Sequence, residues 1–579
     1  MSTIEPVENP QVSSTSIEDS IDLRSIFAGR SRAFSDRLAL RSHGHPEETF
    51  TYGQLAQRGS AFAGHLLASG LNPSDRVALL SESRPRLGIT VLSVLAAGSI
   101  AVPLDPSLTE HELLQLLTDA QPRWLIVSAA QVERGRRLQR CCPSIQRLYC
   151  LDPVEVNASL PSMDAMQLPG YPKPRWRQKD QPALLVYSSG STSQPKGVLI
   201  TYGNLMQQIE GYQQTMQPRA GDMHLSILPL NHLFELVIGF LAPLYAGAGI
   251  CYVDSLLPEE ITAANRACGV RCMLVVPLFL DLLRKGVLAT VRQRGRLQRW
   301  LFATSLMLAR FLSNSGRRQL FRQLHRQLGP DLEYFICGGA PLDGATQTFF
   351  ERLGIRVYQG YGLTETGPVI SSNLPGANKS GSVGRPGPGI ELRIAGNTPG
   401  NDVGEILTRG DHVMKGYYRQ PELSQQAIDD EGWFHTGDLG RIDNDGFLYV
   451  LGRCNNQVAL GNGKKVQPEE IEAAVNGCED IAEFCVLGLP LRHGSNTRTA
   501  EDIHAVVVPS RDAVMRFSGD ANALADHLRR VVYERCRDLA DWKRPRHIHL
   551  REQELPKSST RKVRRNLLRQ ILQQQVPSC

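Results

Sequence analysis

Short apolar segments alternate with longer segments of helical periodicity over the first 450 residues. Residues 76–80, 124–127 and 273–276 have the length and composition of buried strands. Residues 55–67 and 110–117 repeat their apolar positions at the spacing of an amphipathic helix. This alternation is typical of parallel strands covered by helices on both faces. We therefore expect an α/β fold with a large compound body of parallel or mixed sheets.

The pattern changes after residue 453, where turn-forming residues lead to a predicted helix start at Pro468. Glu469 and Glu470 follow this proline, as acids do at the positive end of a helix dipole. A strand-like run at 503–508 and a helix-like run at 523–536 come next. These elements predict a small α+β domain near the C-terminus.

Three segments follow from these patterns. Residues 1–20 carry four acidic residues and no Lys or Arg, which indicates a disordered acidic tail and no secretory signal peptide. Residues 21–453 form the predicted N-terminal body, and residues 454–579 form the predicted small C-terminal domain.

Composition narrows the class of protein. The chain has 579 residues, of which 41% are hydrophobic and 21% charged, so fibrous, disordered and coiled-coil classes are excluded. A formal charge of +6 is too small for this length to indicate nucleic acid. The twelve cysteines lack metal-ligand spacing and are interpreted as reduced cytosolic thiols. Residues 236–253 are uncharged but contain Pro243 and three glycines, which favours a buried helix and core strand over a membrane span.

A loop rich in small and hydroxylated residues follows the apolar run 183–186. Backbone N–H groups and hydroxyls of such a loop can surround phosphate oxygens, and a lysine adds positive charge. Five residues separate Gly190 from Lys196, so the loop does not fit the Walker A pattern. The candidate phosphate-binding residues are Ser188, Ser189, Gly190, Ser191, Thr192, Ser193 and Lys196.

This loop resembles the signature loop of the adenylate-forming (AMP-binding) superfamily, which includes acyl-CoA synthetases, aryl-CoA ligases and the adenylation domains of peptide synthetases. The resemblance covers roughly residues 25–575. Further motifs occur in the family's order: CGGAPL at 337–342, YQGYGLTET at 358–366, GSVGRP at 381–386, GWFHTGD at 432–438, GR at 452–453 and PKSSTRKVRR at 556–565.

The resemblance implies a reaction in two steps. A carboxylate attacks the α-phosphate of ATP and pyrophosphate leaves, and a thiol then takes the acyl group from the acyl-adenylate. Because both reacting groups are anionic, catalysis must supply cations and in-line positioning. By resemblance, Glu365 and Thr192 hold Mg²⁺, Thr364 touches the α-phosphate, and Tyr361 stacks on adenine. The other nucleotide contacts implied by the motifs are Gly338, Gly339, Ala340, Gln359, Gly360 and Gly362.

Three further residues complete the implied nucleotide site. Asp438 accepts hydrogen bonds from the ribose hydroxyls, and Arg453 donates to the ribose or phosphate. Lys562 bridges the carboxylate and the α-phosphate, and leaves when the small domain rotates to open a thiol channel. The chain departs from the family at the hinge residue Asn455, where relatives have Asp or Lys, and at Ala459 and Arg561. Rotation remains expected, but its control is left open.

The acid substrate is indicated by residues 228–235, which resemble the L-P-L-x-H-x-F-E segment of long-chain fatty acyl-CoA synthetases. By resemblance, His232 lies beside the acyl carboxylate. Asp254 comes too late in the chain to hold a substrate ammonium, as amino-acid activators require. The sequence is therefore most like medium- and long-chain fatty acid–CoA ligases that use ATP, Mg²⁺ and CoA.

Three alternatives stay open. The chain could load a phosphopantetheinyl acyl carrier protein as a fatty acyl-AMP ligase, or it could activate an aryl acid. It could also be a catalytically silent membrane adaptor that binds acyl chains or nucleotide, although the intact Glu365, Asp438, Arg453 and Lys562 argue against silence.

An insertion near residues 284–330 is strongly basic. It carries eleven Lys or Arg and no Asp or Glu between Arg284 and Arg326, with aromatic and aliphatic residues between the cations. Basic amphipathic helices of this composition bind anionic membrane surfaces, although a solvated basic face is the alternative. We expect a cytoplasmic protein, with the inner face of the membrane as a peripheral binding surface and no nucleic-acid partner.

Overall fold

The structure is a computed structural model, and it describes residues 23–153, 173–188, 195–396, 402–460, 464–490, 501–517, 520–557 and 563–575. The acidic tail predicted at residues 1–20 lies outside these ranges.

The first sheet of the body has seven strands in the order β18-β8-β7-β4-β3-β5-β6. Alternate residues of strand β3 face different cores: Val77 and Leu79 face α2 and α3, and Ala78 and Leu80 face α4 and α5. Both faces are therefore covered by helices, as the apolar runs predicted. The elements are β3 (Arg76–Leu80), β4 (Ile100–Leu104), β5 (Trp124–Val127), β6 (Arg147–Cys150), β7 (Pro182–Ser188), β8 (Lys196–Thr201), β18 (Gly416–Tyr417), α2 (Tyr52–Ala68), α3 (Pro85–Ala96), α4 (Glu110–Ala120) and α5 (Val132–Cys141).

The second sheet has nine strands in the order β15-β14-β13-β12-β11-β9-β10-β1-β2, parallel from β13 to β1 and antiparallel at both edges. Its strands are β1 (Leu38–Ser42), β2 (Thr49–Thr51), β9 (Met223–Ser226), β10 (Gly249–Tyr252), β11 (Val270–Val275), β12 (Tyr334–Cys337), β13 (Arg356–Tyr361), β14 (Ser371–Ser372) and β15 (Arg385–Pro386). The fold class predicted from the sequence, an α/β body with parallel and mixed sheets, is confirmed.

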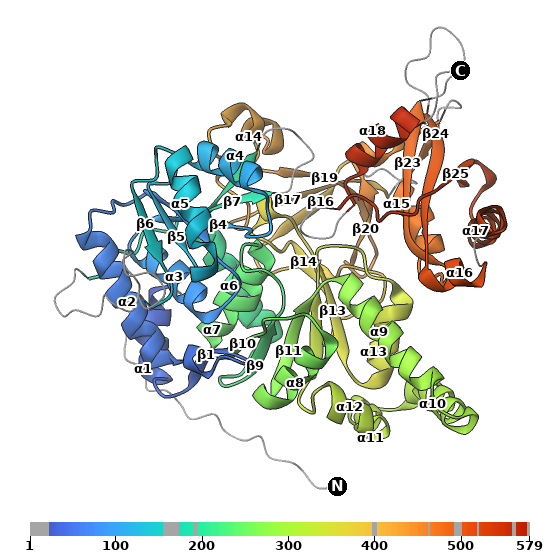
Figure 1. Cartoon of the computed structure of the whole chain (residues 1–579), viewed down its shortest axis with the longest axis horizontal. Helices are drawn as coiled ribbons and strands as arrows, with labels where there is room; N and C mark the ends of the chain where they lie inside the picture. Colours follow the sequence, from blue (N-terminus) through green and yellow to red (C-terminus); the bar gives the residue numbers. More distant parts are fainter. Residues whose placement is uncertain are drawn as a thin grey trace.

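Helices between the two sheets share one core with both of them, which joins the sheets into a single body (Figure 1). They include α6 (Tyr202–Met216), the π-helix η6 (Glu235–Leu241) and α7 (Ala242–Ala246). The uncharged segment at 236–253 thus forms buried helices followed by β10, as predicted. The outer face of the second sheet is covered by α8 (Pro258–Cys268), α9 (Pro277–Arg292) and α13 (Gly344–Leu353).

A third, antiparallel sheet of four strands follows, in the order β16-β17-β19-β20. Its strands are β16 (Glu391–Ile394), β17 (Gly404–Arg409), β19 (Phe434–Ile442) and β20 (Leu448–Arg453), with α14 (Pro421–Ala427) between β18 and β19. Ile394, Ile406 and Leu448 pack with Tyr361 in a small core. The sequence pattern did not separate this sheet from the body, because only one face of it is apolar.

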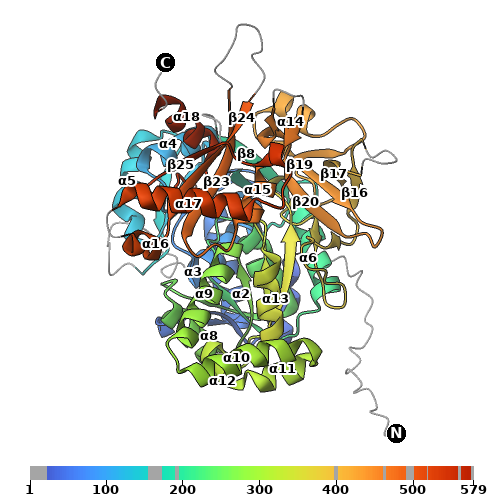
Figure 2. The same ribbon diagram turned by 90° about the vertical axis from the view of Figure 1, so that its right-hand side faces the viewer.

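The smaller C-terminal domain is built on a three-stranded sheet, β23-β24-β25, and lies beside the body (Figures 1 and 2). One face of the sheet packs on α15 and α17, and the other packs on α18. Its elements are α15 (Pro468–Val475), β23 (Ile481–Pro490), β24 (Glu501–Pro509), α16 (Arg511–Arg516), α17 (Ala521–Arg535), β25 (His547–Leu550) and α18 (Arg565–Gln575). The predicted second domain is confirmed, and its boundary at residue 453 stays a prediction.

The basic insertion forms the end of α9 and three further helices: α10 (Arg296–Leu308), α11 (Asn314–Leu320) and α12 (Arg322–Leu328). Both views place α10, α11 and α12 at the rim of the body, below the second sheet (Figures 1 and 2). Within the described part of the chain, no helix has the length and apolarity needed to cross a membrane.

Candidate active site

One tyrosine links the end of the phosphate loop to the predicted metal ligand. The Tyr417 hydroxyl donates a hydrogen bond to Glu365 Oε1 at 3.0 Å, and Lys196 Nζ lies 5.9 Å from the centroid of the Tyr417 ring. Strand β18 holds Tyr417 there by pairing it with Val198 of β8. Burial, and to a lesser extent Glu365, raises the pKa of Tyr417, so the phenol stays a donor. The ammonium group of Lys196 thus lies near the face of the Tyr417 ring, and the carboxylate of Glu365 lies at its hydroxyl.

Sequence reasoning missed Tyr417. It lies in an ordinary strand-like run, and no motif used for the prediction includes it. Its partner is also distant in the sequence, since Glu365 and Tyr417 are separated by 52 positions. The pairing of β18 with β8, and a hydrogen bond from Met414 N to the carbonyl oxygen of Glu365 at 2.8 Å, bring the two segments together.

A second cluster joins three residues that the motifs assigned to the nucleoside. The antiparallel register of β19 and β20 sets Asp438 opposite Arg453, with Asp438 Oδ1 2.6 Å from Arg453 Nε. The Tyr361 hydroxyl donates to Asp438 Oδ2 at 2.7 Å. Asp438 is buried, whereas the Arg453 side chain is 48% exposed. The carboxylate is therefore fixed from two sides, and the guanidinium can still reach a ligand.

The glycine-rich motifs lie at the carboxyl ends of two neighbouring parallel strands. Gly338, Gly339 and Ala340 follow β12, and Gln359, Gly360 and Tyr361 end β13. In open α/β sheets this edge is where ligands bind. A Cβ atom on Gly362 would lie 2.0 Å from the carbonyl oxygen of Pro368, so only glycine fits there.

The segment predicted to meet the acid lies against the first of these glycines. A Cβ atom at Gly338 would be 3.1 Å from Cζ of Phe234, two residues after His232. His232 is half-buried, and its backbone carbonyl accepts the first hydrogen bond of the following helix, from Leu236 N at 2.9 Å. The acid segment and the nucleotide motif are therefore in contact.

Glu235 is the unexpected feature of this segment. Its side chain is fully buried in η6, in space that Gly239 leaves open, because a Cβ there would lie 2.6 Å from the carboxyl carbon. Oε2 has no hydrogen-bond partner among the described residues. Burial raises the pKa of Glu235 to about 8, with Ser226 acting in the opposite direction. A carboxyl group with these surroundings is held in its neutral form.

We predict that Glu235→Gln removes a pH-dependent loss of stability. The native carboxyl keeps its proton up to about pH 8, whereas an unburied one releases it near 4.5. The stabilisation that comes from this raised pKa is complete below pH 4.5 and is lost as the pH rises through 8. Between these two values the free energy of unfolding falls by about 1.4 kcal/mol per pH unit. The thermal midpoint of wild type should therefore fall more between pH 5.5 and 8 than that of the variant.

Glu260→Gln is the matched control, because it makes the same substitution at an exposed position. Parallel midpoint curves for Glu235→Gln and wild type would contradict the prediction.

Glu365 fits the predicted role of magnesium ligand. It lies in a short 3₁₀ helix, η8 (Thr364–Thr366), next to Thr364, and it is partly exposed. No group of three or more His, Cys, Asp or Glu that could hold a metal ion occurs among the described residues. Magnesium carried by nucleotide phosphates needs only one or two protein carboxylates, so a single glutamate suffices.

Several predicted residues lie outside the described ranges. They are Lys562 and the loop residues Ser189, Gly190, Ser191, Thr192 and Ser193, and the side chain of Ser188 is likewise not described. Asn455 lies in η9 (Cys454–Asn456), directly after β20, at the start of the connection to the small domain.

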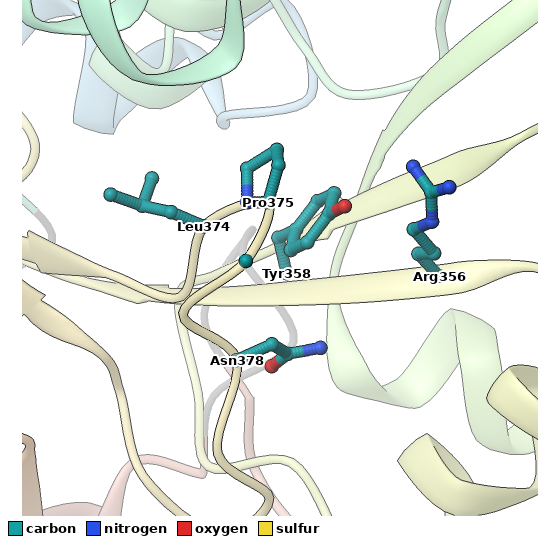
Figure 3. A pocket seen from close by; sticks show the side chains of 6 residues that line it. Arg356, Tyr358, Leu374, Pro375 and Asn378 are labelled. Carbon is teal, nitrogen blue, oxygen red and sulfur yellow. The ribbon is translucent and has the colours of Figure 1, made fainter. Parts of the chain in front are cut away.

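A separate surface cavity of about 370 Å³ opens beside β13. Figure 3 shows Tyr358 and Arg356 on the strand, with Leu374, Pro375 and Asn378 on the adjoining loop. None of the predicted nucleotide residues lines this cavity, so it is not the candidate active site.

Comparison with known proteins identifies relatives that share most of the chain. A long-chain-fatty-acid–CoA ligase, FadD15 of Mycobacterium bovis, is 27% identical, over 76% of this chain and 75% of its own. A long-chain-fatty-acid–[acyl-carrier-protein] ligase, AEE15 of Arabidopsis thaliana, is 25% identical, over 88% and 79%. A feruloyl-CoA synthase of Amycolatopsis is 28% identical, over 82% and 86%.

The fold matches a solved structure over nearly the whole chain. The crystal structure of ATP-bound MatB from Rhodopseudomonas palustris matches with a TM-score of 0.76 and 24% identity, over 96% of this chain and all of that one. The AMP-binding enzyme family model matches residues 27–418, and the AMP-binding enzyme C-terminal domain model matches residues 470–562. The chain therefore belongs to the AMP-binding enzyme family, within the adenylate-forming superfamily that the motifs predicted, and is an AMP-forming acid–thiol ligase.

Proposed function

We propose that the chain activates a medium- or long-chain fatty acid with ATP and transfers the acyl group to CoA. The observation that carries this proposal is the contact between Phe234 and Gly338, because it sets the long-chain-type segment 228–235 against the nucleotide motif. Beyond that contact, η6 continues as a run of buried side chains, most of them apolar. If the carboxylate of the acid binds at His232, its alkyl chain could lie next to the apolar side chains of η6.

In this proposal, different groups of site residues bind different parts of the nucleotide. Asp438 and Arg453 would hold the ribose, and Tyr361 would lie against the adenine. Glu365, with Thr192, would hold the Mg²⁺ that offsets phosphate charge, and Lys196 would face the phosphates from the other side of Tyr417.

The small domain would supply the last cation. In this proposal Lys562, on a lid of residues 454–579, meets the carboxylate and α-phosphate. Asn455 would be the hinge about which the lid turns away from a body of residues 21–453.

A second candidate is an acid that carries polar groups, such as an aryl acid. Two polar side chains are buried in the same region: His224, with no hydrogen-bond partner for either ring nitrogen among the described residues, and Glu235. Burial lowers the pKa of His224 to about 4, so it is neutral and can accept a hydrogen bond. The relationship to a feruloyl-CoA synthase supports this candidate.

The acceptor has two candidates as well, since AEE15 is named for transfer to a carrier protein. We expect CoA because the other two relatives described above, FadD15 and the feruloyl-CoA synthase, are both named for CoA.

A panel of acids tests the proposal. Pyrophosphate release is measured with saturated fatty acids of graded length and with ferulic and malonic acids. We expect kcat/KM to rise with chain length and to exceed that of ferulic acid. The preferred acid is then offered CoA or holo acyl carrier protein, with thioester formation as the readout. A preference for ferulic acid, or for the carrier protein, would replace the corresponding part of the proposal.

A further inference from the structure

Helix α10 turns an apolar stripe toward solvent. Positions 297, 300, 301, 304, 307 and 308 fall on one side of the helix at 100° per residue. They carry Leu, Trp, Leu, Thr, Met and Leu, and all five apolar side chains are exposed. Trp300 is 62% exposed, and Phe311, just beyond the helix, is 74% exposed.

The opposite side of α10 explains how the helix is held. Phe302 and Leu306 face the body and pack on the core under the second sheet, and the Phe302 ring lies 5.8 Å from that of Phe321. The exposed stripe is therefore not the side by which α10 packs on the body. The helix has two apolar sides, and the described chain covers only one of them.

Arg296 borders this stripe, and Arg294 and Arg310 lie just beyond the two ends of the helix. Arg299 is on the opposite side of α10. Arg294, Arg296, Arg299 and Arg310 are exposed and make no ion pair with any described residue. Arg310 also lies over the Phe311 ring, 4.4 Å from its centroid. Aromatic side chains next to unpaired cations are the composition of an interfacial membrane helix.

Not all of the Lys and Arg residues counted at 284–326 are available to bind a membrane. Arg317 donates to the carbonyl oxygens of Ala309 and Glu351, and Arg318 donates to those of Leu332 and Pro330. Both therefore brace the insertion from inside. Arg292 pairs with Glu479 of the small domain at 2.5 Å.

We propose that α10, with Arg294 and Phe311 at its two ends, is a docking surface for an anionic lipid membrane. The charge decides between this occupant and a second copy of the chain. Arg294, Arg296, Arg299 and Arg310 are exposed without an ion pair to any described residue, and residues 284–326 contain no acid, so two copies of this face repel each other, whereas an anionic bilayer attracts it. The stripe would lie in the interface, with Trp300 at the level of the headgroups.

This surface is independent of the acid that the enzyme activates. Its residues are distinct from those assigned to the active site, so its failure would leave the proposed function untouched, and the reverse also holds.

The test is cosedimentation of the full chain with vesicles. We expect binding to vesicles of phosphatidylcholine mixed with phosphatidylglycerol, weakening with added salt, and little binding to phosphatidylcholine alone. The triple variant Arg296→Glu, Arg299→Glu, Arg310→Glu should bind at least about tenfold more weakly. The matched control is Arg511→Glu, Arg530→Glu, Arg535→Glu on the small domain, which makes the same charge change on exposed residues and should bind as wild type.

A second measurement reports on insertion itself. Lipids brominated on the acyl chain should quench tryptophan emission of wild type in the anionic vesicles, and Trp300→Phe should abolish most of that quenching. Adenylation in vesicle-free buffer should be the same for all variants, which shows that they fold.

Equal binding to both vesicle types would overturn the proposal, as would equal loss in the patch and control variants. Quenching that persists in Trp300→Phe would also overturn it. So would a lipid-independent dimer that the patch variants abolish, because the stripe would then be an interface between copies.

Discussion

Replacing Lys562 with alanine is expected to lower adenylate formation by about 100- to 1000-fold, the cost of removing a group that stabilises transition-state charge. In the proposed mechanism this lysine meets the carboxylate and the α-phosphate only while the adenylate forms. Thioester formation from a supplied acyl-adenylate should therefore change far less. ATP–pyrophosphate exchange measures the first step, and thioester formation from synthetic acyl-adenylate and CoA measures the second.

The neighbouring Lys557 provides a matched control. It pairs with Glu483 on β23, so its charge is used within the small domain. Arg565 is similarly held by Glu472 at 2.5 Å. Lys557→Ala should affect both steps equally, through the stability of the domain, whereas Lys562→Ala should separate them. Pyrophosphate exchange that persists in Lys562→Ala would remove this lysine from the reaction.

The elements predicted from the sequence were those with strong hydrophobic periodicity. The runs at 76–80 and 124–127 are β3 and β5, and the helical run at 110–117 lies within α4. A fully buried parallel strand is apolar on both faces, whereas an amphipathic helix has apolar residues every three or four positions. Each pattern therefore indicates which side chains are buried. The family motifs added the expected nucleotide residues.

Pairing between distant strands was not predictable in this way. Asp438 and Arg453 were each assigned to the nucleotide, but their mutual contact depends on the register of β19 with β20. Tyr417 depends likewise on the pairing of β18 with β8. The burial of Glu235 had no sequence signal either, because its space comes from Gly239 and from the irregular turn of a π-helix. Nor could the charge count at 284–326 show that Arg317 and Arg318 bind backbone carbonyls.

Asp438→Asn should raise the KM for ATP by about 10- to 150-fold, the usual cost of losing a hydrogen bond to a charged group. Asparagine keeps the shape of the side chain but loses the negative charge, so it holds Arg453 less firmly and accepts less well from the ribose. If these contacts are the same in the ground and transition states, kcat should change little. Initial rates of pyrophosphate release at varied ATP give both constants, and a thermal melt shows whether the variant is folded.

Tyr361→Phe is the graded control for this prediction. It removes only the hydroxyl that donates to Asp438 at 2.7 Å and leaves the ring in its core with Ile394 and Ile406. Because this hydroxyl only orients Asp438 and the carboxylate itself remains, the KM for ATP should rise less than about tenfold, the lower limit expected for Asp438→Asn. The order wild type, Tyr361→Phe, Asp438→Asn is expected for the KM. If Asp438→Asn instead lowered kcat at an unchanged KM, the Asp438 cluster would act on the reacting groups and not on the bound nucleoside.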